Sequence, residues 1–283
     1  MLSAQEQKRL KLFATDIRIQ CMEEFRSIGA GHVGGSMSMA ELMACLYGRL
    51  MKFDSSEPRM ESRDRIVISK GHAGPAMYAA LALRGFFPLD ELKTLNRLGT
   101  RLPSHTDRNK TPGVDMTTGS LGQGFSSGLG MALGCKLKNL DNYTYIVLGD
   151  GELAEGQVWE CAMFAPANHL DNVIVFVDKN GFQLDGATDE VLPLGNICEK
   201  FESFGWYTAE VANGNDVDEI CSAVEAAKFD TARPKLIVLN TVKGLGCPAA
   251  FDPQLPTNHN MEVSDKIADE TIASLLLEKE ALL

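Results

Sequence analysis

Two polar side chains that could bind a metal ion lie one strand–helix–strand unit apart in the chain. Asp150 sits in a Gly-Asp-Gly tripeptide after the apolar run 143–148, and Asn180 follows the apolar run 173–177. Two such runs joined by a helical segment predict neighbouring parallel strands, and ligands bind beyond the carboxyl ends of such strands. A carboxylate beside an amide oxygen suits Mg²⁺ or Ca²⁺ bound together with a phosphate, whose oxygens complete the coordination shell.

A glycine-dense turn, residues 119–124 (GSLGQG), precedes a predicted helix of small residues. Such a turn lets the backbone approach a ligand, and helix N-terminal amides favour phosphate. Gly128, Gly130 and Gly134 fall inside the helix rather than before it, so we assign them to close helix packing. The sequence contains no GxxxxGK[ST] motif, which excludes a P-loop.

Histidines provide a second signal. Four of the five lie beside glycine or in loop segments: His32, His72, His105 and His259. A single loop histidine is usually just solvated, but three at glycine-rich strand or helix ends favour a shared site. Imidazole suits contacts to phosphate or sugar hydroxyls and proton transfer near neutral pH.

Other polar residues have simpler interpretations. Glu152 and Glu155 begin the crossover helix, where compensation of the helix dipole explains both acids. Ser38 and Glu41 have the spacing of a capping box at the start of a helix expected over 39–51. His169 lies at a predicted helix end, where the dipole again suffices.

Helical and extended segments alternate along the whole chain. We expect helices over 10–25, 39–51, 75–83, 217–229 and 264–283, and strands over 65–69, 143–148, 173–177 and 235–242. This alternation predicts an α/β fold, a doubly wound, mostly parallel sheet with helices on both faces. No repeat or linker interrupts it, so we expect a single domain over residues 1–283.

Composition excludes several functional classes. The 283 residues are 45% hydrophobic and carry a net charge of −11, without a strong cluster of basic residues. Nucleic acid and anionic membranes are therefore not expected partners. The polar N-terminus does not resemble a signal peptide, and no apolar run approaches the length of a membrane span. Seven scattered cysteines without a CxxC pair indicate reduced thiols and a cytoplasmic location.

The strand-end motifs carry a resemblance to a known family. GDGELAEG, followed 30 residues after its Asp by the Asn of DKNGFQLDG, resembles the thiamine diphosphate-binding motif. Four further segments resemble the N-terminal third of transketolase: AGHVGGSMSMAEL, SKGHAGP, TPGVDMTTGSLGQGFSSGLGMA and TVKGLGCP. The similarity runs from about residue 8 to residue 260, and the ordered set is specific. It implies the thiamine diphosphate-binding fold, in particular its diphosphate-binding domain.

The resemblance implies roles for individual residues. Asp150, Asn180 and the backbone carbonyl of Phe182 would bind Mg²⁺ or Ca²⁺. The implied thiamine diphosphate-binding residues are His72, Gly119, Ser120, Leu121, Asp150, Gly151, Glu152 and Asn180. The implied catalytic residues are His32, His105, His259 and Glu155, with His32 and His105 reaching the sugar and Glu155 joining an acidic network between two cofactor sites. Asn260 follows His259 where the family has glycine, and Ser120 replaces a common proline.

The resemblance also implies a partner. Full transketolases carry a pyrimidine-binding domain and a C-terminal domain that this chain lacks, and the pyrimidine domain supplies the glutamate that activates the cofactor. We therefore expect a split transketolase, active only with a separate C-terminal subunit, in an α2β2 heterotetramer. The expected reaction is transfer of a two-carbon ketol unit from a ketose phosphate to an aldose phosphate.

Several alternatives remain open at this stage. The chain could belong to a 1-deoxyxylulose-phosphate synthase-like or 2-oxo acid dehydrogenase-like enzyme, which also use thiamine diphosphate. It could be a non-catalytic module that holds the cofactor. The donor could be an unusual sugar, such as a sulfosugar, because much of the specificity would reside in the partner.

Overall fold

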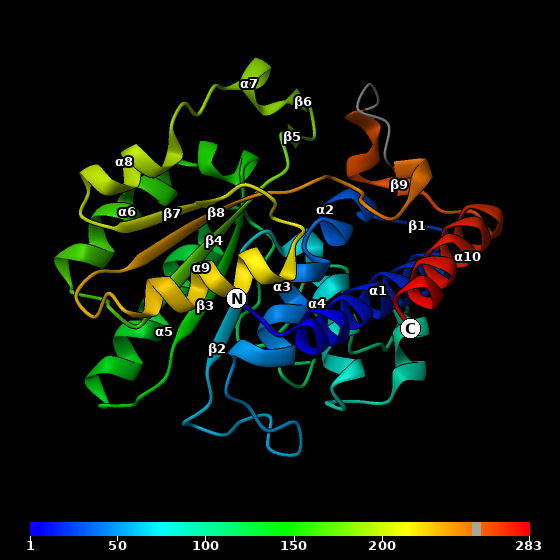
Figure 1. Cartoon of the computed structure of the whole chain (residues 1–283), viewed down its shortest axis with the longest axis horizontal. Helices are drawn as coiled ribbons and strands as arrows, with labels where there is room; N and C mark the ends of the chain where they lie inside the picture. Colours follow the sequence, from blue (N-terminus) through cyan, green and yellow to red (C-terminus); the bar gives the residue numbers. More distant parts are fainter. Residues whose placement is uncertain (251–255) are drawn as a thin grey trace.

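The computed structural model describes residues 1–250 and 256–283 and is built on one parallel sheet (Figure 1). Its spatial order is β2-β3-β4-β8-β7, with all pairs parallel. The strands are β2 (Arg65–Ile68), β3 (Thr144–Gly149), β4 (Val173–Lys179), β7 (Tyr207–Val211) and β8 (Lys235–Asn240). Because β3 and β4 are adjacent, with Gly149 opposite Asp178, the polar residues that follow them meet at one edge of the sheet.

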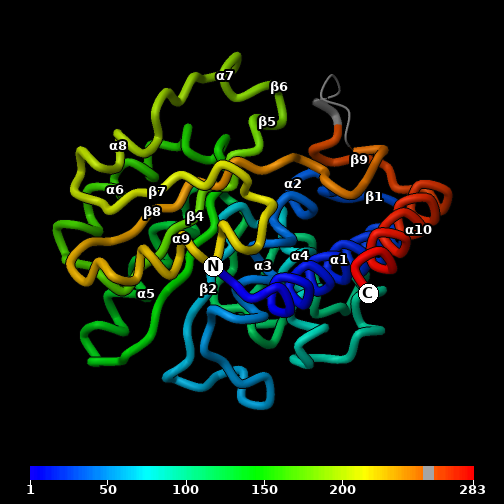
Figure 2. The backbone as a smooth tube through the Cα atoms, viewed as in Figure 1, coloured from blue at the N-terminus to red at the C-terminus, as the bar shows by residue number. Residues whose placement is uncertain are grey.

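Helices cover both faces of the sheet, as the alternation of elements predicted. One face carries α1 (Ala4–Ile28), α3 (Ala40–Cys45), α4 (Gly74–Leu83) and α9 (Val217–Lys228). The other carries α5 (Gln123–Leu137), α6 (Gly156–Ala167) and α8 (Ile197–Ser203). The C-terminal helix α10 (Asp265–Leu282) lies along α1 (Figure 2).

Alternate residues of each strand enter opposite cores, which gives the continuous apolar runs seen in the sequence. In β3, Tyr145 and Val147 belong to the core under α1, α3 and α4, whereas Ile146 and Leu148 belong to the core under α5 and α6. All six residues of β3 are buried. The sheet is therefore a rigid platform with its polar strand ends at one edge.

Short elements connect the larger ones, and several of them lie at that edge. Two small antiparallel pairs lie there, β1 (Ala30–Gly31) with β9 (Met261–Glu262) and β5 (Phe182–Gln183) with β6 (Gly186–Ala187). The short helices are α2 (Val33–Met37), α7 (Thr188–Val191), a π-helix (Leu46–Leu50), and 3₁₀ turns at Gly71–Ala73, Leu89–Thr94, Gly151–Ala154, Pro248–Ala250 and Pro256–His259. The segment of β5, β6 and α7 projects above the sheet in Figures 1 and 2.

The predicted capping box at Ser38 is wrong. Met39, not Ser38, precedes α3, and no side chain caps that helix. The Ser38 hydroxyl instead donates to Asp178 Oδ2 at 2.7 Å, while Glu41 forms a buried ion pair with Arg18 at 2.6 Å. Both side chains satisfy buried charges elsewhere, a demand that outweighs the gain from a local cap.

Among the longer elements, α8 and β7 are absent from the sequence-based expectation. The residues of β7 alternate imperfectly, and only Val211 is buried. This strand lies at the edge of the sheet, and its pairing with β8 defines it more than its own pattern does.

Candidate functional site

A cavity of about 370 Å³ opens at the carboxyl ends of β2, β3 and β4. All but one of the residues assigned from the sequence line it: His32, His72, His105, Gly119, Leu121, Asp150, Gly151, Glu152, Glu155, Asn180, Phe182 and His259. Ser120 is the exception, since its side chain is exposed and does not line the cavity. The tertiary structure thus brings together segments that lie up to 227 residues apart (from His32 to His259).

Asp150 is fixed by the backbone on both sides. Its Oδ1 accepts from the Gly151 N–H at 2.8 Å, and its Oδ2 accepts from the Gly181 N–H at 2.6 Å. Burial, reinforced by the nearby Asp178 carboxylate, raises the pKa of Asp150 to about 6. A positive charge at this carboxylate, such as a divalent cation, would offset that cost.

Asn180 is oriented by two hydrogen bonds in the strand-end turn. Its Oδ1 accepts from the Phe182 N–H at 3.2 Å, and its amide nitrogen donates to Asp178 Oδ2 at 3.2 Å. The amide group is therefore held with its oxygen facing the Phe182 backbone.

A buried ion pair lies beneath these two residues and was not predicted. Asp178 and Lys70 are each about 1% exposed, and the Lys70 ammonium contacts Asp178 Oδ2. Ser38 and Thr241 hydroxyls also donate to this carboxylate. Burial alone would raise the pKa of Asp178, but the Lys70 charge and these hydrogen bonds hold it below its usual value.

Four imidazoles form a cluster over the cavity. The ring centroids of His32 lie 5.4 Å from His72, 5.7 Å from His105 and 5.3 Å from His259, and those of His72 and His259 are 4.7 Å apart. Burial lowers the pKa of each: to about 4 for His32 and His259, and below the usual range for His72 and His105. The cluster is neutral at pH 7, so each ring can both donate and accept a hydrogen bond.

Lys243 is a cavity residue that the sequence interpretation missed. Its side chain is buried, and its ammonium has no hydrogen-bond partner within residues 1–250 and 256–283. Burial lowers the pKa of Lys243 to about 8. Its place in TVKGLG, just beyond β8 (Lys235–Asn240), was the available signal, because a lysine beside glycine at a strand end can meet an anionic ligand.

The glycine-rich turn packs directly on the SKGH segment. A Cβ at Gly71 would lie 2.7 Å from the Gly119 nitrogen, and one at Gly124 would lie 2.6 Å from the Ser69 Cα. Gly122, at φ 79°, adopts a conformation that favours glycine. Glycine at these positions therefore lets two cavity walls meet backbone to backbone.

The donor set fits a hard cation held together with a diphosphate. Within the described parts of the chain, no three His, Cys, Asp or Glu side chains form a group that could hold a metal by themselves. An ion at Asp150 and Asn180 would rely on carboxylate, amide and main-chain oxygens plus those of its ligand, the set that Mg²⁺ and Ca²⁺ prefer. The unpartnered Lys243 ammonium gives an anion a second contact.

The parallel strands end in Gly-Asp-Gly and Asp-Lys-Asn-Gly, and these ends border a cleft with a buried lysine and four histidines. Together these features define a diphosphate-binding domain of the thiamine diphosphate enzymes. Residues 10–261 match the family described as "Transketolase, thiamine diphosphate binding domain", and the chain belongs to that family. The sequence-based assignment of the family, the fold class and a thiamine diphosphate-binding domain is thereby confirmed, while the metal ion stays a prediction.

Two similar proteins are named as transketolase subunits. The chain is 49% identical to the 6-deoxy-6-sulfo-D-fructose transketolase subunit of Clostridium sp. strain MSTE9, over 98% of this chain and 99% of that one. It is 33% identical to an apulose-4-phosphate transketolase subunit of Phocaeicola vulgatus, over 96% and 97%. Both match along almost their whole length.

Full-length transketolases match only in part. The crystal structure of the Campylobacter jejuni enzyme superposes with a TM-score of 0.86 at 26% identity, covering 99% of this chain and 48% of that one. The Geobacillus stearothermophilus transketolase is 34% identical over 84% of this chain and 37% of its own length. The chain thus spans less than half of these enzymes.

Proposed function

We propose that this chain is the N-terminal, cofactor-binding subunit of a split transketolase that transfers a two-carbon ketol unit from a ketose to an aldose. One observation carries the proposal: the strand-end residues, the buried lysine and the histidine cluster converge on one cleft. The end-to-end match to two transketolase subunits supports the assignment. When bound, thiamine diphosphate would supply the nucleophilic carbon and the electron sink that this reaction needs.

Within the proposed enzyme, the strand ends hold the charged part of the cofactor. Asp150, Asn180 and the Phe182 carbonyl bind Mg²⁺ or Ca²⁺, while Gly151, His72 and Lys243 contact the diphosphate. The fixed carboxylate of Asp150 and the unpartnered charge of Lys243 support these roles. Metal and lysine together offset the diphosphate charge.

The neutral histidines act on the sugar. His32 and His105 bind substrate hydroxyls, and His259 holds or moves a proton near the reacting carbon. Their lowered pKa values support this assignment, because a neutral ring can accept a hydroxyl proton at pH 7. The walls at Gly119 and Leu121 border the ring end of the cofactor.

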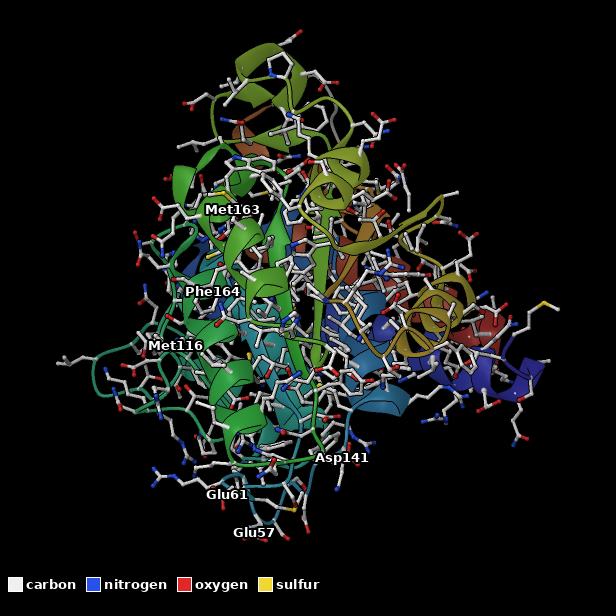
Figure 3. All side chains as sticks on the ribbon, turned by 90° about the vertical axis from the view of Figure 1, so that its left-hand side faces the viewer. Glu57, Glu61, Met116, Asp141, Met163 and Phe164 are labelled. Atoms are coloured by element: carbon white, nitrogen blue, oxygen red, sulfur yellow. The ribbon has the colours of Figure 1, made fainter. Side chains whose placement is uncertain are left out.

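A C-terminal subunit with a pyrimidine domain completes the site in an α2β2 assembly, with Glu155 joining the contact between cofactor sites. The names of the two subunit-type relatives support a partner. The outer face of α5 and α6 supports pairing of two copies: Met163 and Phe164 are exposed there (Figure 3), and side chains at Gly130 and Gly134 would meet nothing within 4 Å. Glycine in an exposed helix costs about 1 kcal/mol, which a closely packed second helix would offset.

A sulfonated ketose is the favoured donor, ahead of an ordinary sugar phosphate. The 49% identity to a sulfofructose transketolase subunit supports this choice over apulose 4-phosphate, for which the corresponding relative is 33% identical. We place the enzyme in the cytoplasm, a location supported by seven free cysteine thiols, all within described residues. Within those residues, none of the helices combines the length and the hydrophobicity that a bilayer crossing requires.

The test combines the purified chain with a candidate C-terminal subunit, a pyrimidine-domain protein that would be sought first in the adjacent open reading frame. With Mg²⁺, thiamine diphosphate and an aldose phosphate as acceptor of the two-carbon unit, we expect ketol transfer from 6-deoxy-6-sulfo-D-fructose to be faster than from fructose 6-phosphate or xylulose 5-phosphate. The rate is measured by release of the aldose that remains of each donor. Calorimetry on the wild-type mixture should show Mg²⁺-dependent cofactor binding, and Asp150→Ala should abolish it.

Each outcome bears on a separate part of the proposal. Robust turnover by the chain alone would refute the split enzyme. Undiminished cofactor binding by Asp150→Ala would refute the metal site. Faster transfer from the sugar phosphates would overturn the sulfonated donor while leaving the transketolase assignment intact.

A further inference from the structure

The carboxylate of Glu152 is held by hydrogen bonds within the protein, although the residue also borders the cavity. The side chain is about 2% exposed, although the residue belongs to the 3₁₀ turn that follows Asp150. Its Oε1 accepts from the Gly122 N–H at 2.7 Å and from the Ser69 hydroxyl, and its Oε2 accepts from the Gly149 N–H at 3.0 Å. Three donors therefore share one carboxylate.

These donors come from three separate walls of the cleft. Ser69 begins the SKGH segment that contains His72, and Gly122 closes the turn that contains Gly119 and Leu121. Gly149 ends β3 just before Asp150. The hydrogen bonds join residues 83 and 30 positions apart along the chain, as well as a local pair. One side chain thus links the wall at the ring end of the cofactor to the wall at its diphosphate end.

Two of the three donors at Glu152 are backbone groups, which restricts what can face them. Gly122 and Gly149 both present backbone N–H groups, which can only donate, so the two oxygens must both accept. A glutamine of the same size would place its NH₂ group against an N–H or a hydroxyl and lose at least one of these bonds.

We propose that Glu152 is a positioning residue that sets the spacing between the Gly119–Gly122 turn and the Gly149–Gly151 strand end, and thereby preorganises the cofactor cleft. This role replaces the direct cofactor contact and the helix-dipole compensation considered from the sequence. It rests on the proposed function in one respect, that thiamine diphosphate occupies the cleft. A misplaced wall would weaken cofactor binding, because preorganisation lowers the cost of binding.

The experiment compares wild type with Glu152→Gln, Glu152→Asp and the matched control Glu278→Gln, an exposed acid on α10 (Asp265–Leu282). Calorimetry with Mg²⁺ and thiamine diphosphate should give a Kd raised about 10-fold or more for Glu152→Gln at unchanged stoichiometry, a smaller rise for Glu152→Asp, and no change for the control. Hydrogen exchange of the cofactor-free chain should speed up in residues 118–126 and 148–152 and stay unchanged in α1 (Ala4–Ile28).

The readouts distinguish positioning from general destabilisation. A merely structural role would lower the binding stoichiometry and speed exchange throughout the chain while leaving the Kd of the folded fraction unchanged, and that result would overturn the proposal. Wild-type Kd and exchange rates in Glu152→Gln would also overturn it. Should Glu152→Gln fail to fold, Ser69→Ala removes one donor, and an unchanged Kd together with unchanged exchange in residues 118–126 would count against the proposal.

If the wild-type chain binds no thiamine diphosphate even with its partner, the proposed function fails. The exchange experiment on the cofactor-free chain then still decides whether Glu152 holds the two walls together.

Discussion

Lys243 shows how one residue can indicate the charge of the ligand that a site takes. Its ammonium is buried without a hydrogen-bond partner among the described residues, an arrangement that costs free energy unless an anion joins it. The charges of Asp150 and Lys70 lie near enough to affect the pKa of Lys243. Lys243 in turn lies near enough to affect the pKa of His259. A diphosphate at the ends of β3 (Thr144–Gly149) and β4 (Val173–Lys179) would supply the anion.

Replacing this lysine should weaken cofactor binding. We expect Lys243→Met to raise the Kd for Mg²⁺–thiamine diphosphate about 10- to 100-fold at pH 7, because a buried charge-assisted contact is lost. In wild type, raising the pH through about 8 removes the lysine charge, so affinity should fall between pH 7 and pH 9. In Lys243→Met this fall should be absent.

Calorimetry at the two pH values measures both effects. Lys179→Met is the matched control, since Lys179 is paired with Glu210 at the protein surface and does not line the cavity. Equal affinities for Lys243→Met and wild type would remove Lys243 from the diphosphate site.

At the scale of elements, α1 (Ala4–Ile28) is well specified by its own sequence. Ser3 and Glu6 form a capping box at its start, and Gly29 in the left-handed conformation ends it. One residue of α1 is in an unfavourable environment. Glu24 is fully buried, and neither of its carboxylate oxygens has a hydrogen-bond partner in the described chain. Burial raises the pKa of Glu24 well above its usual value.

An apolar replacement at this position should stabilise the protein. The folded state holds the Glu24 proton more tightly than the unfolded state does, so wild-type stability falls as pH rises above the unfolded pKa of about 4.5. We expect Glu24→Met to raise the free energy of unfolding by about 1 to 3 kcal/mol at pH 8, and by less at pH 5.

Urea unfolding at the two pH values tests this. The control is Glu23→Met, whose side chain is partly exposed and paired with Arg26, and which should change little. A loss of stability in Glu24→Met at pH 8 would mean that the carboxylate has a favourable partner after all.

At the scale of the whole molecule, the glycines of α5 (Gln123–Leu137) differ in their surroundings. A Cβ at Gly128 would lie 2.6 Å from Ile146 Cδ1, so this glycine packs α5 on the sheet, as the sequence predicted. Gly130 and Gly134 were assigned the same role, but neither would meet a described atom within 4 Å. They lie on the face of α5 and α6 that we propose pairs two copies of the chain.

Adding side chains to this face should prevent assembly without lowering the stability of the isolated chain. In Gly130→Leu/Gly134→Leu we expect the isolated chain to be as stable as wild type or up to about 2 kcal/mol more stable, because leucine favours helix over glycine. The same variant should lose the dimeric mass of the chain or of its complex, measured by sedimentation.

Leu277→Ser, on the exposed side of α10 (Asp265–Leu282), provides the control and should keep the wild-type mass. If the double variant also keeps that mass, the α5–α6 face is not an interface between copies.

The sequence by itself determined the features that depend on neighbouring residues. Apolar runs ending in Gly-Asp-Gly and Asp-Lys-Asn-Gly located β3 and β4 and their ligand-bearing ends, and Ser264 correctly marked the start of α10. Strand period and helix caps act over a few residues, so they can be recognised before the fold is known. The glycine and histidine motifs likewise named most of the cavity wall.

Only the tertiary structure decided which buried charges meet. Ser38 leaves its expected cap for Asp178, 140 residues away, and Lys70 joins the same carboxylate across 108 residues. Glu152 was expected as an acid at a helix end. Its carboxylate instead accepts hydrogen bonds from three walls of the cleft. The physical reason is common to all three: a buried charge must find partners wherever the fold brings them, and that requirement outweighs local preferences.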